Sequence, residues 1–343
     1  MNMSVRYTNV SIFGIGNFGY AILNHLAQKN QSDIKITAYD IDQNIIDSLS
    51  KDRKHPYLHT KTKIDPKINI VTSAEDLIKN CDILILAVSS NVTREVIESI
   101  KPHLAGPIII VNTAKALDYK TGSRLSQIIN SEMSGIKYEY ALLAGGTIAE
   151  DLFHGEPLGV DIASDNESIL PELIALFESP NLKAYPTTDL VGTEYAAAFK
   201  NVISIIAGLT KGLGFSYGSE THIISITAQQ IADACVKKLG AKQGTFFVGR
   251  QVWGNDLWMS CTGNTRNREF GIKVGKLMSV EKAVENMSAS NKTVEGINTL
   301  KTLNRIEGIK DIPIISLLYS LIIDRSEDVQ TFKSHLLGVV DKT

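Results

Sequence analysis

The 343-residue sequence has only three cysteines, Cys81, Cys235 and Cys261, and they lie far apart along the chain. Thiols so few and so scattered argue against a disulfide framework and a cysteine-based zinc site. The N-terminal MNMSVRYTN lacks the apolar segment of a signal peptide, and no apolar run reaches the roughly 18 residues of a membrane span. We therefore expect a soluble cytoplasmic protein with no membrane span and no bound metal.

The sequence also lacks an excess of charge of either sign. Its 35 lysines and arginines nearly balance 37 aspartates and glutamates, which leaves a formal net charge of -2. Proteins whose main partner is a nucleic acid or an anionic membrane surface usually carry a clear basic excess. The balance argues against both partners, and it is compatible with a local anion-binding site.

The chain is long enough for about two domains, and its two halves differ in pattern. In the first half, short apolar runs alternate with helical segments, and the continuous run at 81–88 is typical of a parallel sheet covered on both faces. Strands are expected at 9–13, 34–39, 68–71, 81–88, 107–113, 138–143, 158–163 and 182–185. From Thr188 on the pattern is almost only helical, with segments at 192–214, 219–240, 254–276 and 279–285 and two more after 292. The expected fold is an α/β domain with a mostly parallel sheet at 1–187, followed by an all-helical domain at 188–343.

A glycine-rich turn, GIGNFG, follows the first expected strand and opens a helix. In this context Gly14 permits the tight turn, Gly16 lets the backbone approach a pyrophosphate, and Gly19 allows the helix to pack closely on the strand. Asp40 ends the next strand, where a carboxylate would accept hydrogen bonds from the ribose hydroxyls of NAD. The alternative is a turn that binds nothing and an aspartate that only caps the next helix.

Two later loops also follow expected strands. Lys115 comes after the strand at 107–113, and Gly145 and Thr147 come after the strand at 138–143. Because ligands of parallel sheets bind beyond the carboxyl ends of the strands, these residues are expected at the edge of a site. A surface lysine and an ordinary turn are the alternatives.

The expected helix at 192–214 is almost wholly apolar but carries Lys200. On a helical wheel its small and polar residues share one sector, which contains Thr193, Ala197, Lys200, Asn201, Ser204 and Gly208. A lysine at the margin of a buried face would be partly desolvated, which would lower its pKa and suit it to proton exchange near neutral pH. The alternative is a structural lysine that reaches water or a carboxylate.

Short polar side chains and two arginines gather at 256–268, in the segment DLWMSCTGNTRNR. Guanidinium groups bind phosphate bidentately, and the hydroxyls and amides add further donors. A solvated helix start would explain Arg268 equally well, but it would explain the polar residues between Asp256 and Asn267 poorly. We therefore expect an oxyanion-binding pocket in this segment.

In this order, the motifs resemble those of the NAD(P)-dependent glycerol-3-phosphate dehydrogenases over nearly the full length of the chain. The KNV block at Lys200 and the segment NDLWMSCTGNTRNREFG are the most specific, and GIGNFG, AVSSNVTREVIESIKPHL and AGGTIAED support them. The resemblance implies a Rossmann-type N-terminal domain and a helical C-terminal domain. It also implies the interconversion of dihydroxyacetone phosphate and sn-glycerol 3-phosphate with NAD.

The resemblance further implies roles for individual residues. Lys200 matches the lysine that transfers the proton as general acid or base. The residues expected to bind the substrate are Lys115, Gly145, Thr147, Asn201, Asp256, Thr265, Arg266 and Asn267. Those expected to bind the cofactor are Gly14, Gly16, Asn17, Phe18, Gly19, Asp40, Lys115, Ala149, Arg266 and Glu295.

The sequence departs from the family pattern in three loops. The family's usual SGPSFAEE reads AGGTIAED here, so this loop lacks a proline that would stiffen it. WGNDL stands where bacterial members often show GLGDL. The Lys115 loop reads TAKALD, without the glycine that is common in the family. These changes leave open a related dehydrogenase for another small hydroxy compound. A dinucleotide-binding regulator without turnover is the third reading, and intact Lys115, Lys200 and Asp256 argue against it.

Two carboxylates bear on the choice between NAD and NADP. Asp40 and Asp42 stand where many bacterial members of the family carry a basic residue suited to a 2′-phosphate. Because a phosphate beside two carboxylates is electrostatically disfavoured, we predict NAD, with NADP as the less favoured cofactor. A homodimer is an option that the sequence does not decide.

Overall fold

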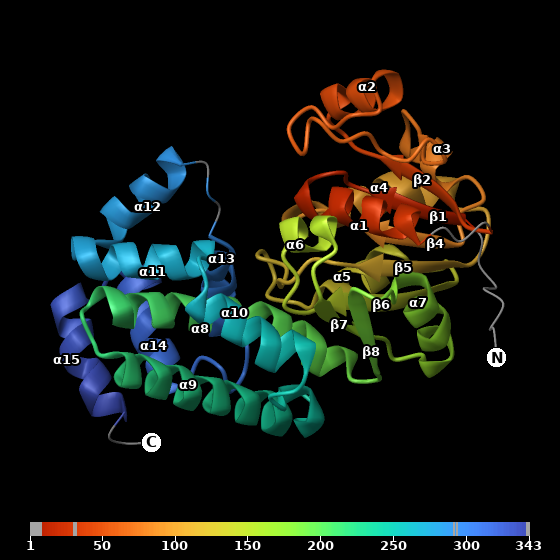
Figure 1. The fold of residues 1–343 in the computed structure, drawn as a ribbon. Coiled ribbons are helices and arrows are strands. Elements are labelled where there is room, and N and C mark those ends of the chain that lie inside the picture. The colour runs from red at the N-terminus through yellow and green to blue at the C-terminus, as the bar shows by residue number, and fades with distance from the viewer. Residues whose placement is uncertain (1–8, 30–32, 291, 293, 341–343) are drawn as a thin grey trace. The chain divides into compact units, whose positions relative to one another are not determined.

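The computed structural model describes residues 9–29, 33–290, 292 and 294–340, which form two compact units (Figure 1). The first unit contains the chain up to Ala114 together with Leu125–Leu190, and the second contains Lys115–Arg124 and the chain from Val191 on. The border expected at 187/188 lies close to the division at 190/191. The expected division at 187/188 placed Lys115–Arg124 in the first domain, whereas in the structure this segment belongs to the second unit.

The first unit is built on an eight-stranded sheet. Its strands are β1 (Asn9–Phe13), β2 (Lys35–Tyr39), β3 (Asn69–Ile70), β4 (Ile83–Leu86), β5 (Ile108–Asn112), β6 (Tyr138–Ala144), β7 (Leu158–Ala163) and β8 (Leu182–Thr187). They lie in the order β3-β2-β1-β4-β5-β6-β7-β8, and every neighbouring pair is parallel except β6 and β7. The mostly parallel, Rossmann-type sheet is therefore confirmed, and its order reverses between β1 and β4, where such sheets bind ligands.

Helices cover both faces of this sheet, which explains why β4 and β5 are apolar and completely buried. The helices are α1 (Asn17–Gln28), α2 (Gln43–Lys51), α3 (Ala74–Ile78), α4 (Thr93–Ile100), α5 (Leu125–Glu132), α6 (Ala149–His154) and α7 (Leu170–Phe177). Buried residues of α1, α2, α6 and α7 share one hydrophobic cluster with Ile12, Ile85 and Val111 of the sheet. Burial of this cluster holds the glycine turn after β1 in place.

Apart from Lys115–Arg124, which forms turns and an isolated bridge, the described residues of the second unit form helices and the loops between them, as expected. Its helices are α8 (Leu190–Gly212), α9 (Tyr217–Lys238), α10 (Asp256–Thr262), α11 (Arg266–Leu277), α12 (Val280–Ala289), α13 (Glu295–Thr302), α14 (Pro313–Tyr319) and α15 (Val329–Val340). The single helix expected at 254–276 was wrong, because Gly263 and Thr265 have extended backbones and separate α10 from α11. The interruption gives α11 a separate N-terminus at Arg266.

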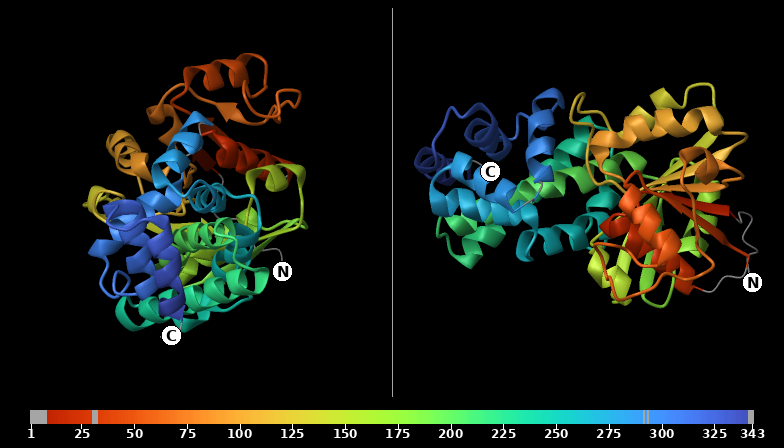
Figure 2. Two further views of the ribbon diagram at one scale, coloured as in Figure 1. Left: turned by 90° about the vertical axis from the view of Figure 1, so that its left-hand side faces the viewer. Right: turned by 90° about the horizontal axis from the view of Figure 1, so that it is seen from above.

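Helix α8 is long and apolar enough to cross a membrane, since an 18-residue window within its 23 residues has a mean hydropathy of 1.2. The expected absence of a membrane span rested on uninterrupted apolar runs, whereas α8 meets a test of length and mean hydropathy although it contains Glu194 and Lys200. In the structure 89% of that window is buried inside the protein, and α8 lies among the other helices of the second unit in both views of Figure 2. Its apolar character is accounted for by the core of this unit.

Helices α8 and α11 touch backbone to backbone at glycines. A Cβ atom on Gly208 would lie 2.0 Å from the carbonyl oxygen of Arg268, and one on Gly271 would lie 2.2 Å from that of Ile205. Only residues without a side chain allow this approach. The contact holds the first half of α11 beside residues 205–209 of α8, which lie one to three turns after Lys200.

Candidate active site

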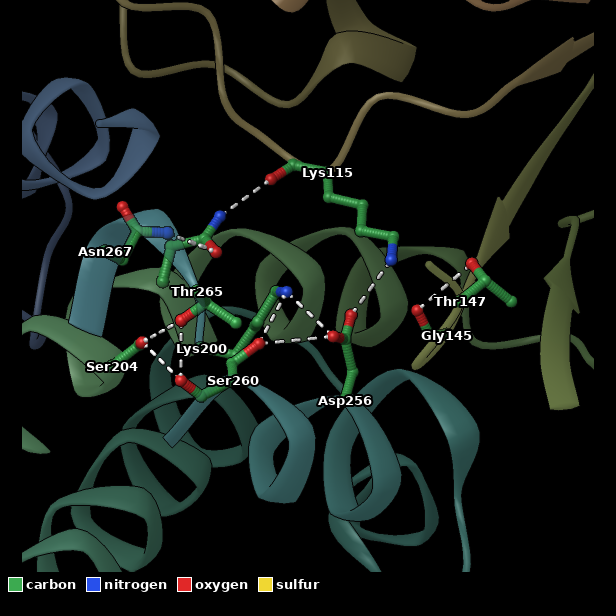
Figure 3. A network of polar contacts seen from close by, with 10 residues as sticks. Lys115, Gly145, Thr147, Lys200, Ser204, Asp256, Ser260, Thr265 and Asn267 are labelled. Atoms are coloured by element: carbon green, nitrogen blue, oxygen red, sulfur yellow. Dashed lines mark hydrogen bonds and ion pairs between the residues drawn. The ribbon is translucent and has the colours of Figure 1, made fainter. Parts of the chain in front are cut away.

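Two lysines share one buried carboxylate in the second unit (Figure 3). Lys200 Nζ donates to Asp256 Oδ1 at 2.8 Å and to the hydroxyl of Ser260 at 2.9 Å. Lys115 Nζ donates to Asp256 Oδ2 at 3.2 Å. The side chain of Asp256 is 0% exposed and that of Lys200 is 8% exposed, so water screens these charges weakly. With all three groups ionised, the cluster carries one net positive charge.

The charges in this cluster act on Lys115 in opposite directions. Burial is the largest effect and lowers the pKa of Lys115, and the positive charge of Lys200 lowers it further. The carboxylate of Asp256 opposes both effects and raises this pKa. Asp256 therefore helps to keep a proton on an amine that would otherwise lose it more readily. Such a cluster can donate a proton and stabilise a developing negative charge.

The surroundings of Lys200 bear on both interpretations of its helix. Its amine is not at a half-exposed margin, because the residue is only 6% exposed and contacts a carboxylate. Contact with a carboxylate was part of the structural alternative, but Asp256 also holds Lys115. A structural ion pair needs one cation for one carboxylate, whereas the buried carboxylate of Asp256 contacts both Lys200 and Lys115.

The polar sector of α8 continues from Lys200 into a network that joins three segments of the second unit. Asn201 Nδ2 donates to the carbonyl oxygen of Lys115 at 3.4 Å, and Asn267 Nδ2 donates to Asn201 Oδ1 at 2.9 Å. Thr265 Oγ1 donates to the carbonyl oxygen of Ser260 at 2.8 Å, and Ser204 Oγ donates to the same oxygen at 2.6 Å. The structure thus brings together Lys115, Lys200, Asn201, Asp256, Thr265 and Asn267.

Arg266 and Glu295 lie at the first positions of α11 and α13, with Nη2 and Oε1 3.9 Å apart. Their side chains are 55% and 46% exposed, so the pair is loose and solvated. An arginine at the N-terminus of a twelve-residue helix can receive an anion. Arg268, in contrast, is buried and paired with Glu220 at 2.8 Å. The expectation that both arginines belong to an oxyanion set was therefore wrong for Arg268.

Gly296 provides a test of how tightly this network is packed. Its amide donates to Asn267 Oδ1 at 2.9 Å, and a Cβ atom at this position would lie 2.8 Å from the carbonyl oxygen of Asn201. We expect Gly296→Ala to lower the free energy of unfolding by about 1–3 kcal/mol, since the backbone of α8 or α13 must shift. Chemical denaturation measures this change. Gly218→Ala is the matched control, because a Cβ atom at Gly218 in α9 meets nothing within 4 Å, and an equal loss in both variants would contradict the expectation.

The glycine turn of the first unit follows β1 and opens α1. Gly14 has φ +94°, and a Cβ atom there would lie 2.7 Å from the carbonyl oxygen of Ala87, whereas one on Gly19 would lie 1.9 Å from that of Gly14. At Gly16 a Cβ atom would meet nothing within 4 Å. The turn is thus crowded at two glycines and open at Gly16, where Asn17 and half-buried Phe18 begin α1.

Asp40 supports this turn from the end of β2. Its Oδ2 accepts a hydrogen bond from the amide of Ile15 at 2.5 Å, and its Oδ1 accepts one from the amide of Asp42 at 2.9 Å. The cap of α2 is Asp42, whose carboxylate accepts from the amide of Asn44. The alternative that Asp40 only caps the next helix was therefore wrong.

The loop after β6 folds back on itself within the first unit. The amide of Thr147 donates to the carbonyl oxygen of Gly145 at 2.7 Å, and both residues are buried. Ala149 begins α6 two residues later. The structure therefore places Gly145, Thr147 and Ala149 in a different unit from the lysine cluster.

Two contributing residues were absent from the expected site. Ser260 accepts from Lys200, and its place one helical turn after Asp256 could have indicated it. His55 is buried, with Nε2 2.9 Å from the carbonyl oxygen of Ile15 and Nδ1 accepting from the amides of Tyr57 and Leu58. Because Nδ1 accepts, Nε2 carries the single proton, and burial lowers the pKa of this imidazole. No local sequence pattern pointed to this neutral histidine beneath the glycine turn.

Comparison with known proteins gives two matching family models. The model described as the N-terminus of NAD-dependent glycerol-3-phosphate dehydrogenase matches residues 9–170, and the model of its C-terminus matches residues 189–333. Together they cover nearly all of the described chain.

Individual relatives agree with these models. A glycerol-3-phosphate dehydrogenase (NAD(P)+) of Halothermothrix orenii is 32% identical over 318 residues, which are 91% of this chain and 90% of the relative. One of Clostridium perfringens is 29% identical over 92% of this chain and 93% of the relative.

Solved structures show the same fold. A glycerol-3-phosphate dehydrogenase of Coxiella burnetii has a TM-score of 0.83 at 21% identity and covers 96% of this chain and 99% of its own. One of Plasmodium falciparum has a TM-score of 0.86 at 17% identity and covers 96% of this chain and 94% of its own. The chain therefore belongs to the NAD-dependent glycerol-3-phosphate dehydrogenase family.

Proposed function

We propose that this protein is an NAD-dependent glycerol-3-phosphate dehydrogenase that interconverts sn-glycerol 3-phosphate and dihydroxyacetone phosphate, with Lys200 as general acid and base. The relatives bear this name, and their similarity extends over nine-tenths of the chain. The observation that carries the proposal is the buried amine of Lys200, which shares the carboxylate of Asp256 with Lys115.

The glycine turn suits the diphosphate of a dinucleotide. Gly16 is exposed and unobstructed, and it precedes the first turn of α1, whose amides face outward from the helix start. Gly14, Gly16, Asn17, Phe18, Gly19 and Asp40 are the residues that would hold the cofactor there, and Ala149, Lys115, Arg266 and Glu295 are further proposed contacts. When bound, the nicotinamide supplies or accepts the hydride.

The residues of the second unit supply the proton. The ammonium of Lys200 would donate a proton to the ketone oxygen of dihydroxyacetone phosphate, where negative charge develops during reduction, to give the alcohol. In the reverse direction, neutral Lys200 removes the hydroxyl proton. The charge of Lys115 stabilises the alkoxide before the proton moves, and Asp256 orients both amines.

The remaining polar residues of the site are proposed to bind the substrate. These are Lys115, Gly145, Thr147, Asn201, Asp256, Thr265, Arg266 and Asn267. Arg266 suits the phosphate, because its guanidinium is half exposed and lies at the start of α11.

We expect Arg266→Ala to raise the Michaelis constant for dihydroxyacetone phosphate about 10- to 100-fold, since a charge-assisted hydrogen bond contributes about 1.5–3 kcal/mol. Turnover at saturation is expected to change much less, and steady-state kinetics measures both constants. Arg325→Ala is the control, because Arg325 forms a similarly exposed pair with Glu281. A Michaelis constant unchanged by the loss of Arg266 would place the phosphate elsewhere.

Cofactor preference depends on Asp40. We expect Asp40→Asn to lower the ratio of kcat/KM for NADH to that for NADPH by about tenfold, because it removes a negative charge that repels a 2′-phosphate. Asparagine keeps an oxygen acceptor for only one of the two amides, that of Ile15 or that of Asp42. Thermal unfolding of the variant checks that the turn is still folded. Rates with both cofactors at subsaturating concentrations give the ratio. An unchanged ratio would show that Asp40 does not select the cofactor.

One assay separates the candidate functions. Oxidation of NADH and NADPH is followed with dihydroxyacetone phosphate and with a panel of other small ketones. A clear preference for dihydroxyacetone phosphate with NADH supports the proposal. A preference for another ketone would favour the related dehydrogenase suggested by the altered Gly145–Thr147 loop, and cofactor binding without any turnover would favour a regulator.

The proposal also includes the cellular compartment and the partners of the protein. All three cysteines are free thiols, which suits a reducing compartment, and we propose a cytoplasmic location. A phosphorylated three-carbon substrate is the partner proposed, with no nucleic acid and no membrane span. A homodimer stays a prediction, which light scattering during size-exclusion chromatography can test.

A further inference from the structure

Three potential metal ligands meet on the first unit, outside the residues assigned to the reaction. His59 lies in the connection between α2 and β3, and Glu150 and His154 lie one turn apart on α6. Glu150 Oε2 is 3.2 Å from His59 Nε2, and Glu150 Oε1 is 3.0 Å from His154 Nε2. One ligand atom from each residue lies within 4.8 Å of the other two. Both imidazoles therefore point at the same carboxylate.

These distances are close to those of a zinc site. Zinc bonds of about 2.0–2.1 Å in a tetrahedral arrangement place neighbouring ligand atoms about 3.3 Å apart. Each imidazole nitrogen lies about this far from one oxygen of Glu150, His59 Nε2 from Oε2 and His154 Nε2 from Oε1. A shared ion requires the three ligand atoms, which lie within 4.8 Å of one another, to move closer together. The side chain of His154 is 56% exposed and can make this movement, whereas that of His59 is 18% exposed.

The ring of His59 is held in advance by aromatic neighbours. It stacks on the ring of Phe153 with centroids 3.6 Å apart and planes inclined by 7°, and Tyr20 of α1 stacks at 6.2 Å. The backbone of His59 has φ +43°, a left-handed conformation that is uncommon for a residue with a side chain. One ligand is thus fixed and the other two come from a single helix, which reduces the entropy lost on binding an ion.

The loop that carries His59 is closed at its base, and its tip contacts α6. At the base, the amide of Ile64 donates to the carbonyl oxygen of Arg53 at 2.8 Å, and Arg53 Nη2 donates to the carbonyl oxygens of Asp65 and Ile68. At the tip, His59 meets α6 through the Glu150 contact and the ring stacking. An ion bound by all three residues would fasten the tip to α6 and clamp the loop at both ends.

We propose that His59, Glu150 and His154 bind one divalent transition-metal ion, which fastens the loop of residues 53–64 to α6. Two imidazoles and one carboxylate suit zinc and its first-row neighbours better than calcium or magnesium. The exposed side of Glu150 and His154 leaves the remaining coordination positions to water. The sequence predicted no metal because its three cysteines are scattered, and His59 lies far in sequence from Glu150 and His154.

The test is binding of Zn²⁺ to the full chain after treatment with a chelator and its removal. Isothermal titration calorimetry is expected to give one strong site per chain in the wild type. His154→Ala is expected to weaken it by at least about tenfold, and His59→Ala to do the same. His154 is exposed, so its replacement leaves folding intact. Cobalt(II) spectra are expected to show a bound ion without a thiolate charge-transfer band, which separates this site from the cysteines.

His335→Ala is the matched control. His335 Nδ1 lies 3.3 Å from Glu327, so it presents the same two ligand types without a second imidazole. Its loss is expected to leave the strong site unchanged, and Zn²⁺ is expected to raise the melting temperature of the wild type and this control but not of His154→Ala. Absence of a strong site in the wild type, or equal affinity in the wild type and both ligand variants, would overturn the proposal and leave a cluster held only by hydrogen bonds and ring stacking.

Discussion

Replacing Lys200 with alanine is expected to lower turnover at least about 10²- to 10⁴-fold while changing the affinity for NADH little. The amine that donates the proton is lost, and the glycine turn proposed to bind the dinucleotide belongs to the other unit. Asp256 keeps its contact with Lys115, so no carboxylate is left without a cation. Stopped-flow measurement of NADH oxidation and fluorescence titration of NADH binding measure the two quantities.

Chemical rescue distinguishes proton transfer from a purely structural role of Lys200. The alanine variant leaves space where a small alkylamine can bind, and added amines are expected to restore part of the rate, to an extent that depends on their pKa. Lys211→Ala is the control, since Lys211 lies on the same helix but is exposed. Turnover in Lys200→Ala equal to the wild type would remove this lysine from the mechanism, and failure of every amine to rescue a folded variant would favour a structural role.

Replacing Asp256 with asparagine is expected to reduce kcat/KM about 10- to 100-fold, because two charge-assisted hydrogen bonds to lysines are weakened at a fully buried position. The pH dependence gives a sharper test. The negative charge of Asp256 raises the pKa of Lys115 against the effect of burial, so its removal lowers that pKa further. The amine then loses its proton at a lower pH, and the decline of kcat/KM at high pH is expected to move toward neutrality.

Asp233→Asn is the control for this shift. Asp233 accepts hydrogen bonds from Lys237 and Gln229 on the surface of α9, so its charge is screened by water. No role in the site is proposed for it. Its pH profile is expected to match that of the wild type. If Asp256→Asn kept the wild-type profile as well, the titration of Lys115 would not contribute to catalysis.

Much of the fold was predictable because its signals are local. The strands at 9–13 and 158–163 have the expected bounds, since short apolar runs are properties of neighbouring residues. The turn at Gly14 was predictable for the same reason, because one short segment contains the strand end, the glycines and the helix start. The single helix expected at 254–276 failed at Gly263, where the backbone takes an extended form that helical periodicity does not reveal.

The composition of the site depended on contacts that are distant in sequence. The sequence alone marked Lys200 as an unusual charge in an apolar helix and marked Asp256 as part of a polar segment. Only the tertiary structure shows that Lys200 and Asp256 form a hydrogen bond and that Lys115, 141 residues away from Asp256 in the sequence, contacts the same carboxylate. It also shows that Arg268 is paired with Glu220 instead of lying in the site. The physical reason is that the sequence pattern of a helix or strand indicates which of its faces is buried. The partner of a buried charge depends instead on how segments that are distant in sequence pack against one another.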